Sequence, residues 1–468
     1  MKRVLMLAYY FPPSKAAGTF RTLRFVRDLP ASGWQPSVLT VRPETYLASE
    51  LDLDLLHNVP GAVRVARTPA PPLHRTYKRL HNQAKQWFWR GRTPGMRAVA
   101  KPSSNSVTTT PAGNTDLLYM LSRTPDIDAG WYAHALARGL GMIACERPDV
   151  LYATGGPWTT FLVARDLARL TRLPLVLDYR DPWTANPSVW RAGNSFEKLA
   201  LRLEKTVVRR ANWIIANTDV LRETLITTHG EWVGKRTVVI HNSFDAADYE
   251  TPEPARESVF TLSYAGALYD AHSPEPILRA VAALIERRPT LRGRFRVRLV
   301  GAGAPRVASQ VRALGLEDVI LVQEPVSHAE AVRLQRAAHA LLLLLTVPSD
   351  HSTFVPSKLF EYVAARRPIF AVTRGGALDR LLRDRQLTPW IYRPEDTEAM
   401  VQGLLHLYER YERDCLPQLS DAVVRGFSGG AAARALAGVL EAAAARRPLE
   451  PALVPEAPVV TTAEVPVA

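Results

Sequence analysis

Hydrophobic residues follow two patterns along this chain, short continuous runs and runs spaced by three or four positions. Residues 4–10 form a continuous apolar run, as expected of a parallel strand covered on both faces. Residues 19–29 carry apolar side chains at helical spacing, and residues 36–41 form a second apolar run. This order predicts a β-α-β opening, and therefore a Rossmann-like domain that starts at residue 2.

The same alternation continues and then restarts once. In the first half we expect further strands at 150–153, 175–178, 213–217 and 237–240. A polar stretch containing proline, 252–257, reads as a linker, and the apolar run 260–264 opens a second β-α series. The sequence therefore predicts an α/β protein with two Rossmann-like domains, over 1–250 and 258–427, whose ligand loops lie at the carboxyl ends of both sheets. A closing helix over 428–446 and a disordered tail over 447–468, which lacks periodicity, complete the chain.

Composition and charge narrow the possible partners. The chain has 468 residues, of which 47% are apolar and 22% charged, so it is globular. Its formal net charge of +14 favours an anionic partner, either a nucleotide, a phospholipid surface or nucleic acid. No zinc knuckle, RNA-binding signature or concentrated basic tail is present, so we expect no nucleic-acid partner.

The expected location is cytoplasmic. The two cysteines, Cys145 and Cys415, lie far apart in sequence and do not make a disulfide framework. The N-terminus reads as a buried strand and not as a signal peptide, because its apolar run is short and breaks at Pro12-Pro13. No run of 18 or more apolar residues is present to span a membrane.

Two stretches of the first half are irregular. Residues 74–92 mix arginines and lysines with tyrosine, tryptophan and phenylalanine, a composition that suits a helix lying on an anionic membrane surface. A solvated helix with a few core contacts fits the same residues. Residues 92–116 are rich in proline, serine, threonine and glycine, which predicts a flexible surface insertion.

The most informative stretch is 352–368, between the apolar runs 340–345 and 368–372. It predicts a turn at the carboxyl end of a strand that opens into a helix near Pro356, the place where open parallel sheets bind anionic ligands. Ser357, Lys358 and Glu361 lie at that opening. The lysine can meet a phosphate and the glutamate can accept hydrogen bonds from sugar hydroxyls. A capped helix with a solvated lysine is the alternative.

Seven motifs in order resemble a known family across roughly residues 2–445. They are YYFPP at 9–13 with Gly18 and Arg21 beyond it, DVLYATGGP at 149–157, DYRDPW at 178–183, HNSFD at 241–245, YAG at 264–266, VGAG at 300–303 and PSKLFE at 356–361 through Pro368. Each is weak alone, but the ordered set resembles the retaining glycosyltransferases of family 4, which have the GT-B fold. In that fold two Rossmann-like domains face each other across a cleft, and we expect the closing helix to pack back on the first domain.

The resemblance implies a hexosyltransferase that moves a sugar from a UDP- or GDP-linked donor to a lipid-linked, polyprenyl-type or glycan acceptor. The particular motifs are similar to enzymes of exopolysaccharide, O-antigen and other envelope glycans, which would place the protein peripherally on the inner face of the membrane. Two other hypotheses for the function stay open, a GT-B-like nucleotide-sugar 2-epimerase and a catalytically weak binding subunit.

The resemblance also assigns donor-binding positions. Gly18 matches a glycine that lets the donor diphosphate approach its helix, and Arg21 either reaches the same phosphates or faces solvent. Glu361 matches a glutamate that binds the ribose hydroxyls. The full expected donor set is Gly18, Arg21, Gly266, His272, Gly301, Gly303, Val326, Ser357, Lys358, Leu359 and Glu361.

The sequence departs from the family at two donor positions. Ala267 stands where relatives usually have an arginine, no lysine follows it, and His272 is the only possible cation there. Thr353 lies near the position of a second glutamate. Lys358 is therefore the best candidate for the diphosphate cation, and the departures motivate the reading as a binding subunit.

The turn after the strand at 175–178 occupies the place where many relatives keep a histidine near the reacting sugar. Arg180 and Asp181 are our catalytic candidates there, together with Lys358; an Asp-Pro turn that caps a helix is the alternative. Gly155, Gly156 and Trp158 are expected on the acceptor side, where the glycines resemble a phosphate nest; a structural tight turn is the alternative for the two glycines. By analogy with the family we expect front-face displacement with no metal and no other cofactor, and the sequence has no HxxxH motif or cysteine cluster.

Overall fold

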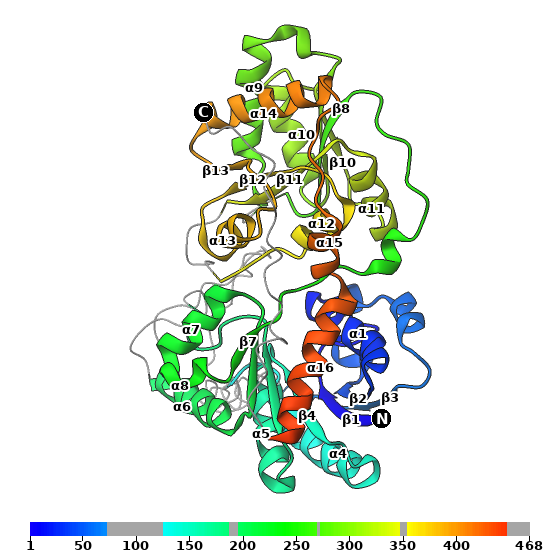
Figure 1. Cartoon of the computed structure of the whole chain (residues 1–468), viewed down its shortest axis with the longest axis vertical. Coiled ribbons are helices and arrows are strands. Elements are labelled where there is room, and N and C mark those ends of the chain that lie inside the picture. Colours follow the sequence, from blue (N-terminus) through cyan, green and yellow to red (C-terminus); the bar gives the residue numbers. More distant parts are fainter. Residues whose placement is uncertain (73–124, 187–194, 269–271, 347–352, 447–468) are drawn as a thin grey trace, which may run out of the picture.

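The computed structural model describes residues 1–72, 125–186, 195–268, 272–346 and 353–446. It contains two α/β domains, one above the other along the long axis of the molecule (Figure 1). The stretches expected to form a membrane-facing helix (74–92), a flexible insertion (92–116) and a disordered tail (447–468) lie outside the described residues. Within the described part of the chain, no helix is both long and apolar enough to cross a membrane.

The N-terminal domain is built on a seven-stranded parallel sheet in the order β3-β2-β1-β4-β5-β6-β7. Its central strands are covered on both faces, which explains why they are continuous apolar runs in the sequence. The strands are β1 (Lys2–Leu7), β2 (Trp34–Val41), β3 (Arg64–Thr68), β4 (Val150–Thr154), β5 (Leu175–Tyr179), β6 (Trp213–Ala216) and β7 (Thr237–Val239).

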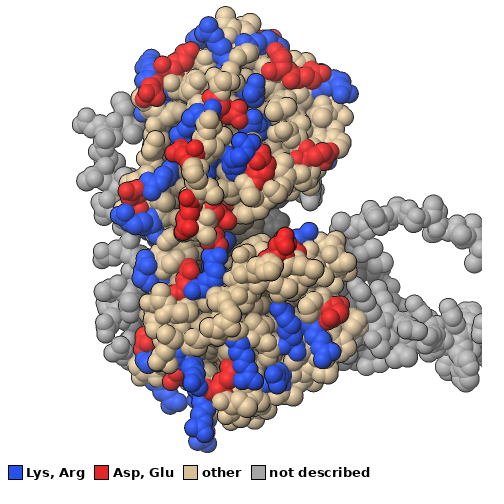
Figure 2. All heavy atoms as spheres, turned by 90° about the vertical axis from the view of Figure 1, so that its right-hand side faces the viewer, with Lys and Arg blue, Asp and Glu red and all other residues tan. Residues whose placement is uncertain are grey.

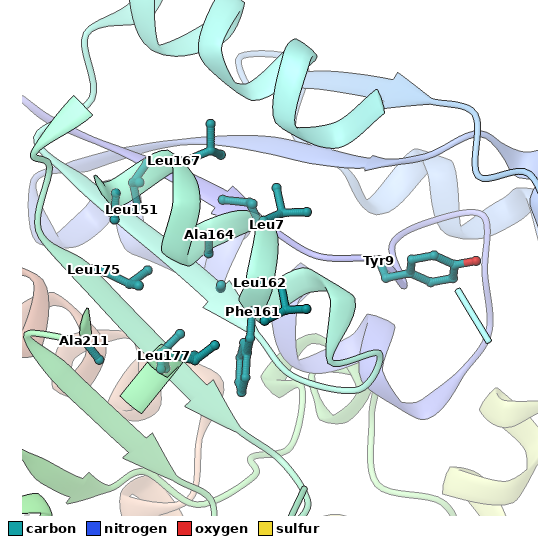
Figure 3. Packing of buried hydrophobic residues seen from close by; sticks show 14 of the residues in the cluster. Leu7, Tyr9, Leu151, Phe161, Leu162, Ala164, Leu167, Leu175, Leu177 and Ala211 are labelled. Atoms are coloured by element: carbon teal, nitrogen blue, oxygen red, sulfur yellow. The ribbon is translucent and has the colours of Figure 1, made fainter. Parts of the chain in front are cut away.

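Helices cover both faces of this sheet. Those of the N-terminal domain are α1 (Ala17–Asp28), α4 (Trp131–Glu146), α5 (Thr159–Thr171), α6 (Ser195–Arg210), α7 (Asp219–His229) and α8 (Glu231–Gly234). Helices α4, α5 and α6 bury their apolar sides against one face, where Phe161, Ala164 and Leu167 of α5 meet Leu7, Leu151 and Leu177 of the sheet (Figure 3). Helix α1 lies on the other face.

The C-terminal domain holds a six-stranded parallel sheet in the order β10-β9-β8-β11-β12-β13. Its strands are β8 (Phe260–Ala265), β9 (Phe295–Val300), β10 (Ile320–Gln323), β11 (Ala340–Leu345), β12 (Ile369–Thr373) and β13 (Ile391–Tyr392). Its helices are α9 (Glu275–Arg287), α10 (Ala304–Ala313), α11 (His328–Ala337), α12 (Lys358–Ala365), α13 (Gly376–Asp384), α14 (Thr397–Glu412) and α15 (Asp421–Gly426). Short 3₁₀ turns lie at Leu29–Ser32 (η1), Pro43–Thr45, Ala48–Glu50, Leu53–Asn58, Ala246–Tyr249 and Pro289–Leu291.

The chain passes between the domains twice, and the two passages touch. Phe244 lies where the chain enters the C-terminal domain, and Ser428 lies where it returns to the N-terminal domain. The two residues form a parallel bridge, and the backbone oxygen of Phe244 accepts a 3.0 Å hydrogen bond from the Gly429 N–H. Helix α16 (Gly429–Ala445) then runs down the N-terminal domain beside α1 (Figure 1). The expectation that the closing helix packs back on the first domain is therefore confirmed, and its small alanine side chains allow the close approach.

Candidate active site

The carboxyl ends of the two sheets meet at the boundary between the domains. Thr218, which follows β6, donates a 3.2 Å hydrogen bond to the backbone oxygen of Thr353, which follows β11. Arg380 of α13 forms a 2.6 Å ion pair with Glu223 of α7. The loops at the ends of both sets of strands therefore face one another, which is the arrangement that places ligands in α/β proteins.

Lys358 is the first residue of α12 and points at the backbone of the loop after β8. A β-carbon on Gly266 would lie 2.3 Å from its Nζ atom, and Nζ also lies 5.8 Å from the centre of the Tyr264 ring. Burial lowers the pKa of the Lys358 amine, and the nearby charge of Glu361 opposes that shift. A partly desolvated ammonium with a glycine beneath it is well suited to an anionic ligand, because little water competes for it.

The glycines around Lys358 allow the loops to touch. A β-carbon on Gly301, which follows β9, would lie 1.6 Å from the backbone oxygen of Gly266. The two loops are joined there by a 2.7 Å hydrogen bond from the Gly266 N–H to the Val300 oxygen. Gly303, at φ 99°, is the residue immediately before helix α10. Gly301 therefore tolerates no side chain, since a β-carbon would separate the loops, and the positive φ of Gly303 favours glycine there.

Glu361 lies one turn beyond Lys358 and its carboxylate is held in place. Its Oε2 atom accepts a 2.9 Å hydrogen bond from the buried side chain of Gln335 on α11. Its backbone oxygen accepts a 3.0 Å bond from the Tyr249 hydroxyl. The other carboxylate oxygen has no hydrogen-bond partner among the described residues, so it remains able to accept from a sugar hydroxyl.

Arg180 approaches the boundary from the N-terminal domain. Its Nε and Nη2 atoms donate to the backbone oxygens of Gly155 and Gly156, at 2.8 and 2.5 Å. Its Nη1 atom lies over Gly18, where a β-carbon would be 1.5 Å away. Burial lowers the pKa of this guanidinium, while Asp181 and Asp178 raise it. The sequence placed Gly18 and Arg180 in separate motifs, and the structure brings them together.

Asp181 follows Arg180 on the exposed side of the same turn. Desolvation by the surrounding protein raises the pKa of its carboxyl, and the positive charge of Arg180 opposes the shift. Its carboxylate forms no ion pair with the described residues. The group therefore stands at the boundary with its oxygens available to a ligand.

Arg21 does not bind a ligand and does not face solvent. Its side chain is 5% exposed and binds both carboxylate oxygens of the fully buried Asp178, at 2.8 and 2.9 Å. Its remaining N–H groups donate to the backbone oxygens of Ile240 and His241 and to the side chain of Asn242. All five donors of the guanidinium are used, so both expectations for Arg21 are wrong.

The structure bears on two further donor-site expectations. The side chain of Leu359 is fully buried in the core of the C-terminal domain, so Leu359 could meet a ligand only through its backbone. Burial, and to a lesser extent the charge of Lys358, lower the pKa of the His272 imidazole, and the hydrogen bond to the Leu344 oxygen opposes this shift, so the cationic form expected there is disfavoured. The Nδ1 atom of His272 lies 2.8 Å from the backbone oxygen of Leu344. Val326 and Ser357 are exposed.

The expected acceptor-side residues are used within the domain. The N–H of Gly155 donates to the backbone oxygen of Asp178 at 2.8 Å, so this N–H is not part of a phosphate nest. Trp158 stacks on Trp183 with ring centres 5.4 Å apart and an angle of 4°. These residues support the turn that carries Arg180.

The sequence did not single out a cavity of about 840 Å³ at the carboxyl ends of β1, β2 and β3. Three tyrosines line it, Tyr9, Tyr10 and Tyr46, with Arg42 and Asp128. The Tyr9 hydroxyl donates to Asp128 at 2.7 Å, and Tyr46 stacks on Tyr10. Aromatic faces beside charged and hydroxyl groups suit a polyhydroxylated ligand.

Arg24 was also missed, although it lies one turn after Arg21. It belongs to a cluster of charges that joins the domains, in which Arg27 pairs with Asp245 at 2.7 Å. Acidic and basic side chains meet along this boundary in Figure 2. Burial lowers the pKa of the Arg24 guanidinium, and Asp245 and Glu361 oppose the shift. The repeat of arginine at 21, 24 and 27 was the available signal.

Comparison with known protein families decides the assignment. Residues 18–243 match the model of the glycosyl transferase 4-like domain, and residues 260–410 match that of glycosyl transferases group 1. The chain belongs to the GT-B glycosyltransferases. Within the described residues of this glycosyltransferase, no group of three or more His, Cys, Asp and Glu could hold a metal ion.

Curated relatives of the glycosyltransferase match over part of its length. A protein of Kineococcus radiotolerans named D-inositol 3-phosphate glycosyltransferase is 31% identical over 198 residues, which are 39% of this chain and 44% of that protein. The protein of the same name from Kribbella flavida is 28% identical over 187 residues, 37% of this chain and 43% of the relative. The chain thus spans less than half the length of these relatives.

Solved structures share the fold of the glycosyltransferase at low identity. HepE of Anabaena in complex with UDP has a TM-score of 0.54 at 14% identity and covers 95% of this chain and 98% of its own. The lipopolysaccharide outer core galactosyltransferase WaaB, in its apo form, has a TM-score of 0.53 at 12% identity, covering 95% and 99%. A putative UDP-N-acetylglucosamine 2-epimerase of Listeria monocytogenes reaches 0.51 at 12% identity, covering 94% and 96%.

Proposed function

We propose that this glycosyltransferase moves a sugar, with retention of configuration, from a UDP- or GDP-linked donor to a lipid-linked or glycan acceptor of an envelope glycan or exopolysaccharide. The observation that carries the proposal is the pair formed by Lys358 and Glu361. A desolvated ammonium and a fixed carboxylate lie one turn apart at the start of α12, as a diphosphate next to a ribose requires.

Charge stabilisation would come from both domains. Lys358 approaches the diphosphate from the C-terminal domain, and the Nη1 atom of Arg180 approaches it from the N-terminal domain over Gly18. Two fixed cations favour departure of the nucleotide because they are already oriented where negative charge develops. The leaving phosphate oxygen then takes the proton of the acceptor hydroxyl as that hydroxyl attacks the same face of the sugar.

The acceptor is proposed to enter from the tyrosine-lined cavity of the N-terminal domain. The names of the curated relatives make D-inositol 3-phosphate one acceptor to be tested, and the resemblance to envelope enzymes adds lipid-linked and glycan acceptors. The basic and aromatic composition of residues 74–92 supports contact with the inner face of an anionic membrane. Neither the donor site nor the acceptor side is proposed to need a metal or other cofactor.

Calorimetry and product analysis test the proposal together. UDP, GDP and their sugars are titrated into the wild type, Lys358→Ala and Glu361→Ala, and transfer to the acceptor panel is followed by mass spectrometry. We expect one nucleotide class to bind the wild type and transfer to be lost in both variants. Wild-type activity in both variants would reject this donor site.

The same measurements separate the alternatives. A 2-epimerase would convert the sugar of the donor without any acceptor present, a possibility kept by the fold similarity to the Listeria monocytogenes protein. A binding subunit would bind a nucleotide and form no product. Its motivation is Ala267 and Thr353, and Thr353 contributes a backbone oxygen to the contact between the domains.

A further inference from the structure

A second cavity, lined by charged residues, lies at the opposite end of the N-terminal sheet, beside the amino end of the inner strand β5. It has a volume of about 530 Å³ and is lined by four arginines, Arg169, Arg172, Arg210 and Arg446. It adjoins Leu173 and Pro174, which lead into β5, whereas Arg180 and Asp181 follow that strand. At roughly 3.3 Å per residue, the length of β5 keeps this cavity well over 10 Å from the candidate active site.

The four arginines are not paired with a carboxylate in the part of the chain that the structure describes. Among the described residues, none of them forms an ion pair with a carboxylate, and no acidic residue lines the cavity. Asp166 lies nearest along the chain, but Arg165 and the Tyr132 hydroxyl already bind it. Within the described residues, the positive charge of the cavity is therefore not fully neutralised by acids, although the charge of Arg169 helps to lower the pKa of Asp166.

Helix dipoles account for part of this charge only. Helices α5, α6 and α16 all end here, with Arg172 and Arg446 as the residues that terminate α5 and α16. Each helix end carries about half a negative charge, so three ends offset about 1.5 of the four positive charges.

The cavity is held rigidly and presents free donors. Arg210 donates to the backbone oxygens of Ala168 and Leu173, at 2.5 and 2.8 Å, which fixes its guanidinium in the wall. Burial and the charges of Arg446 and Arg169 lower the pKa of Arg210. The side chains of Arg169 and Arg172 make no hydrogen bond to the described residues, so their donors face the cavity or solvent.

We propose that this arginine cavity binds a phosphate group, at a site separate from the one that holds the sugar donor. Guanidinium groups match the oxygens of phosphate in pairs, and several of them around one concave site favour a group with two negative charges. A membrane phospholipid headgroup and a free phosphate or phosphate ester share this chemistry.

Inorganic phosphate titrated by calorimetry into the full-length protein tests the site. The test variant is Arg169→Gln with Arg172→Asn, because asparagine tolerates the left-handed conformation of residue 172 (φ 60°). The matched control is Arg138→Gln with Arg312→Gln, which removes the same charge from exposed positions elsewhere. We expect the test variant to lose one phosphate-binding event, or to bind about tenfold more weakly, with no change in the control.

Phosphate binding at the donor site contributes equally to all three proteins, because none of the substitutions touches it. Identical titrations of the wild type and the test variant would overturn the proposal.

Co-sedimentation with phosphatidylcholine vesicles, with and without phosphatidylglycerol, then identifies whether the bound phosphate belongs to a lipid or to a free molecule. Loss of sedimentation in the test variant alone assigns a lipid headgroup, and unchanged sedimentation with lost phosphate binding assigns a free phosphate. Any contribution of residues 74–92 to vesicle binding is the same in all variants.

Discussion

The side chain of Lys358 occupies the space directly above Gly266, where a β-carbon would come within 2.3 Å of Nζ. The loop after β8 thus sets the position of the Lys358 ammonium, although Lys358 itself belongs to α12. Replacement of Lys358 by methionine keeps most of the packing and removes the charge. We expect kcat/KM for sugar transfer to fall about 100- to 1,000-fold, as for other electrostatic contacts to a developing charge. Steady-state kinetics measure the loss, and an unchanged kcat/KM would contradict the assignment.

Gly266→Ala tests the same contact from the other side. The new methyl group would push Lys358 out of place, so nucleotide-sugar binding should weaken by roughly tenfold or more, and the backbone strain at residue 266 (φ 154°) should also lower the free energy of unfolding. Gly141→Ala is the matched control, because nothing lies within 4 Å of its β-carbon position in helix α4. That control should retain binding and be stabilised by up to about 1 kcal/mol. Calorimetry and urea unfolding separate the two effects.

Arg21→Met should destabilise the protein without a specific effect on donor binding. It leaves the buried carboxylate of Asp178 without its charged partner, although the Tyr152 hydroxyl still donates to it, and this loss costs about 3–5 kcal/mol. Arg287→Met is the control, because Arg287 makes the same two-bonded contact with Glu398 on the surface, where solvent screens the charges. Urea unfolding gives both values. A stable Arg21→Met protein that no longer binds the donor would restore the ligand role.

Gln335→Leu should weaken nucleotide binding by about tenfold, because the carboxylate of Glu361 loses the donor that orients it. Gln402→Leu is the natural comparison. Its side chain donates to Glu398 at 3.0 Å in the same way, but far from the boundary on the exposed face of α14. Calorimetry should distinguish them, and equal affinity of the two variants would show that Glu361 needs no such support.

His339 should make the protein sensitive to acid. Its Nδ1 atom accepts a 3.1 Å hydrogen bond from the Thr261 N–H, and burial, with the charge of Arg256, lowers its pKa from 6.5 to about 4. The unfolded chain takes up the proton more readily, so the free energy of unfolding should fall as the pH drops from about 6.5 to 4, by roughly 3 kcal/mol. Urea unfolding across this pH range in the wild type and in His339→Gln measures how much His339 contributes to the free energy of unfolding. The exposed His406→Gln should keep the wild-type slope.

The sequence predicted the fold well where burial is complete. Strands such as β1 and β11 are covered on both faces and are therefore unbroken apolar runs. Strand β3 was missed, because its five residues include two arginines at the edge of the sheet. Helices α7 and α13 were missed as well. Helix α7 buries only Leu221 and Leu225 on a polar segment, so tertiary contacts define it more than periodicity does. Helix α13 does show helical spacing, with Leu378, Leu381 and Leu382 buried, but it is short and was overlooked.

The candidate site was only partly accessible to such reasoning. Lys358 and Glu361 were found because a turn between a strand and a helix fixes where they point. Arg21 was misjudged because helical spacing does not tell which face is buried, and its partner Asp178 is 157 positions away. Gln335 carries no motif, and only packing of α11 against α12 brings it to Glu361.

Helix α16 has a consequence for how the protein is made. Its alanines and leucines complete one apolar face of the N-terminal sheet, together with residues of α1 and β1. On the ribosome, the part of that face that α16 covers stays exposed until the whole C-terminal domain has been synthesised, an interval of roughly tens of seconds at about 5–20 residues per second. The first domain to emerge is therefore the last to be finished, and a chaperone bound to this face during translation would protect the chain from aggregation.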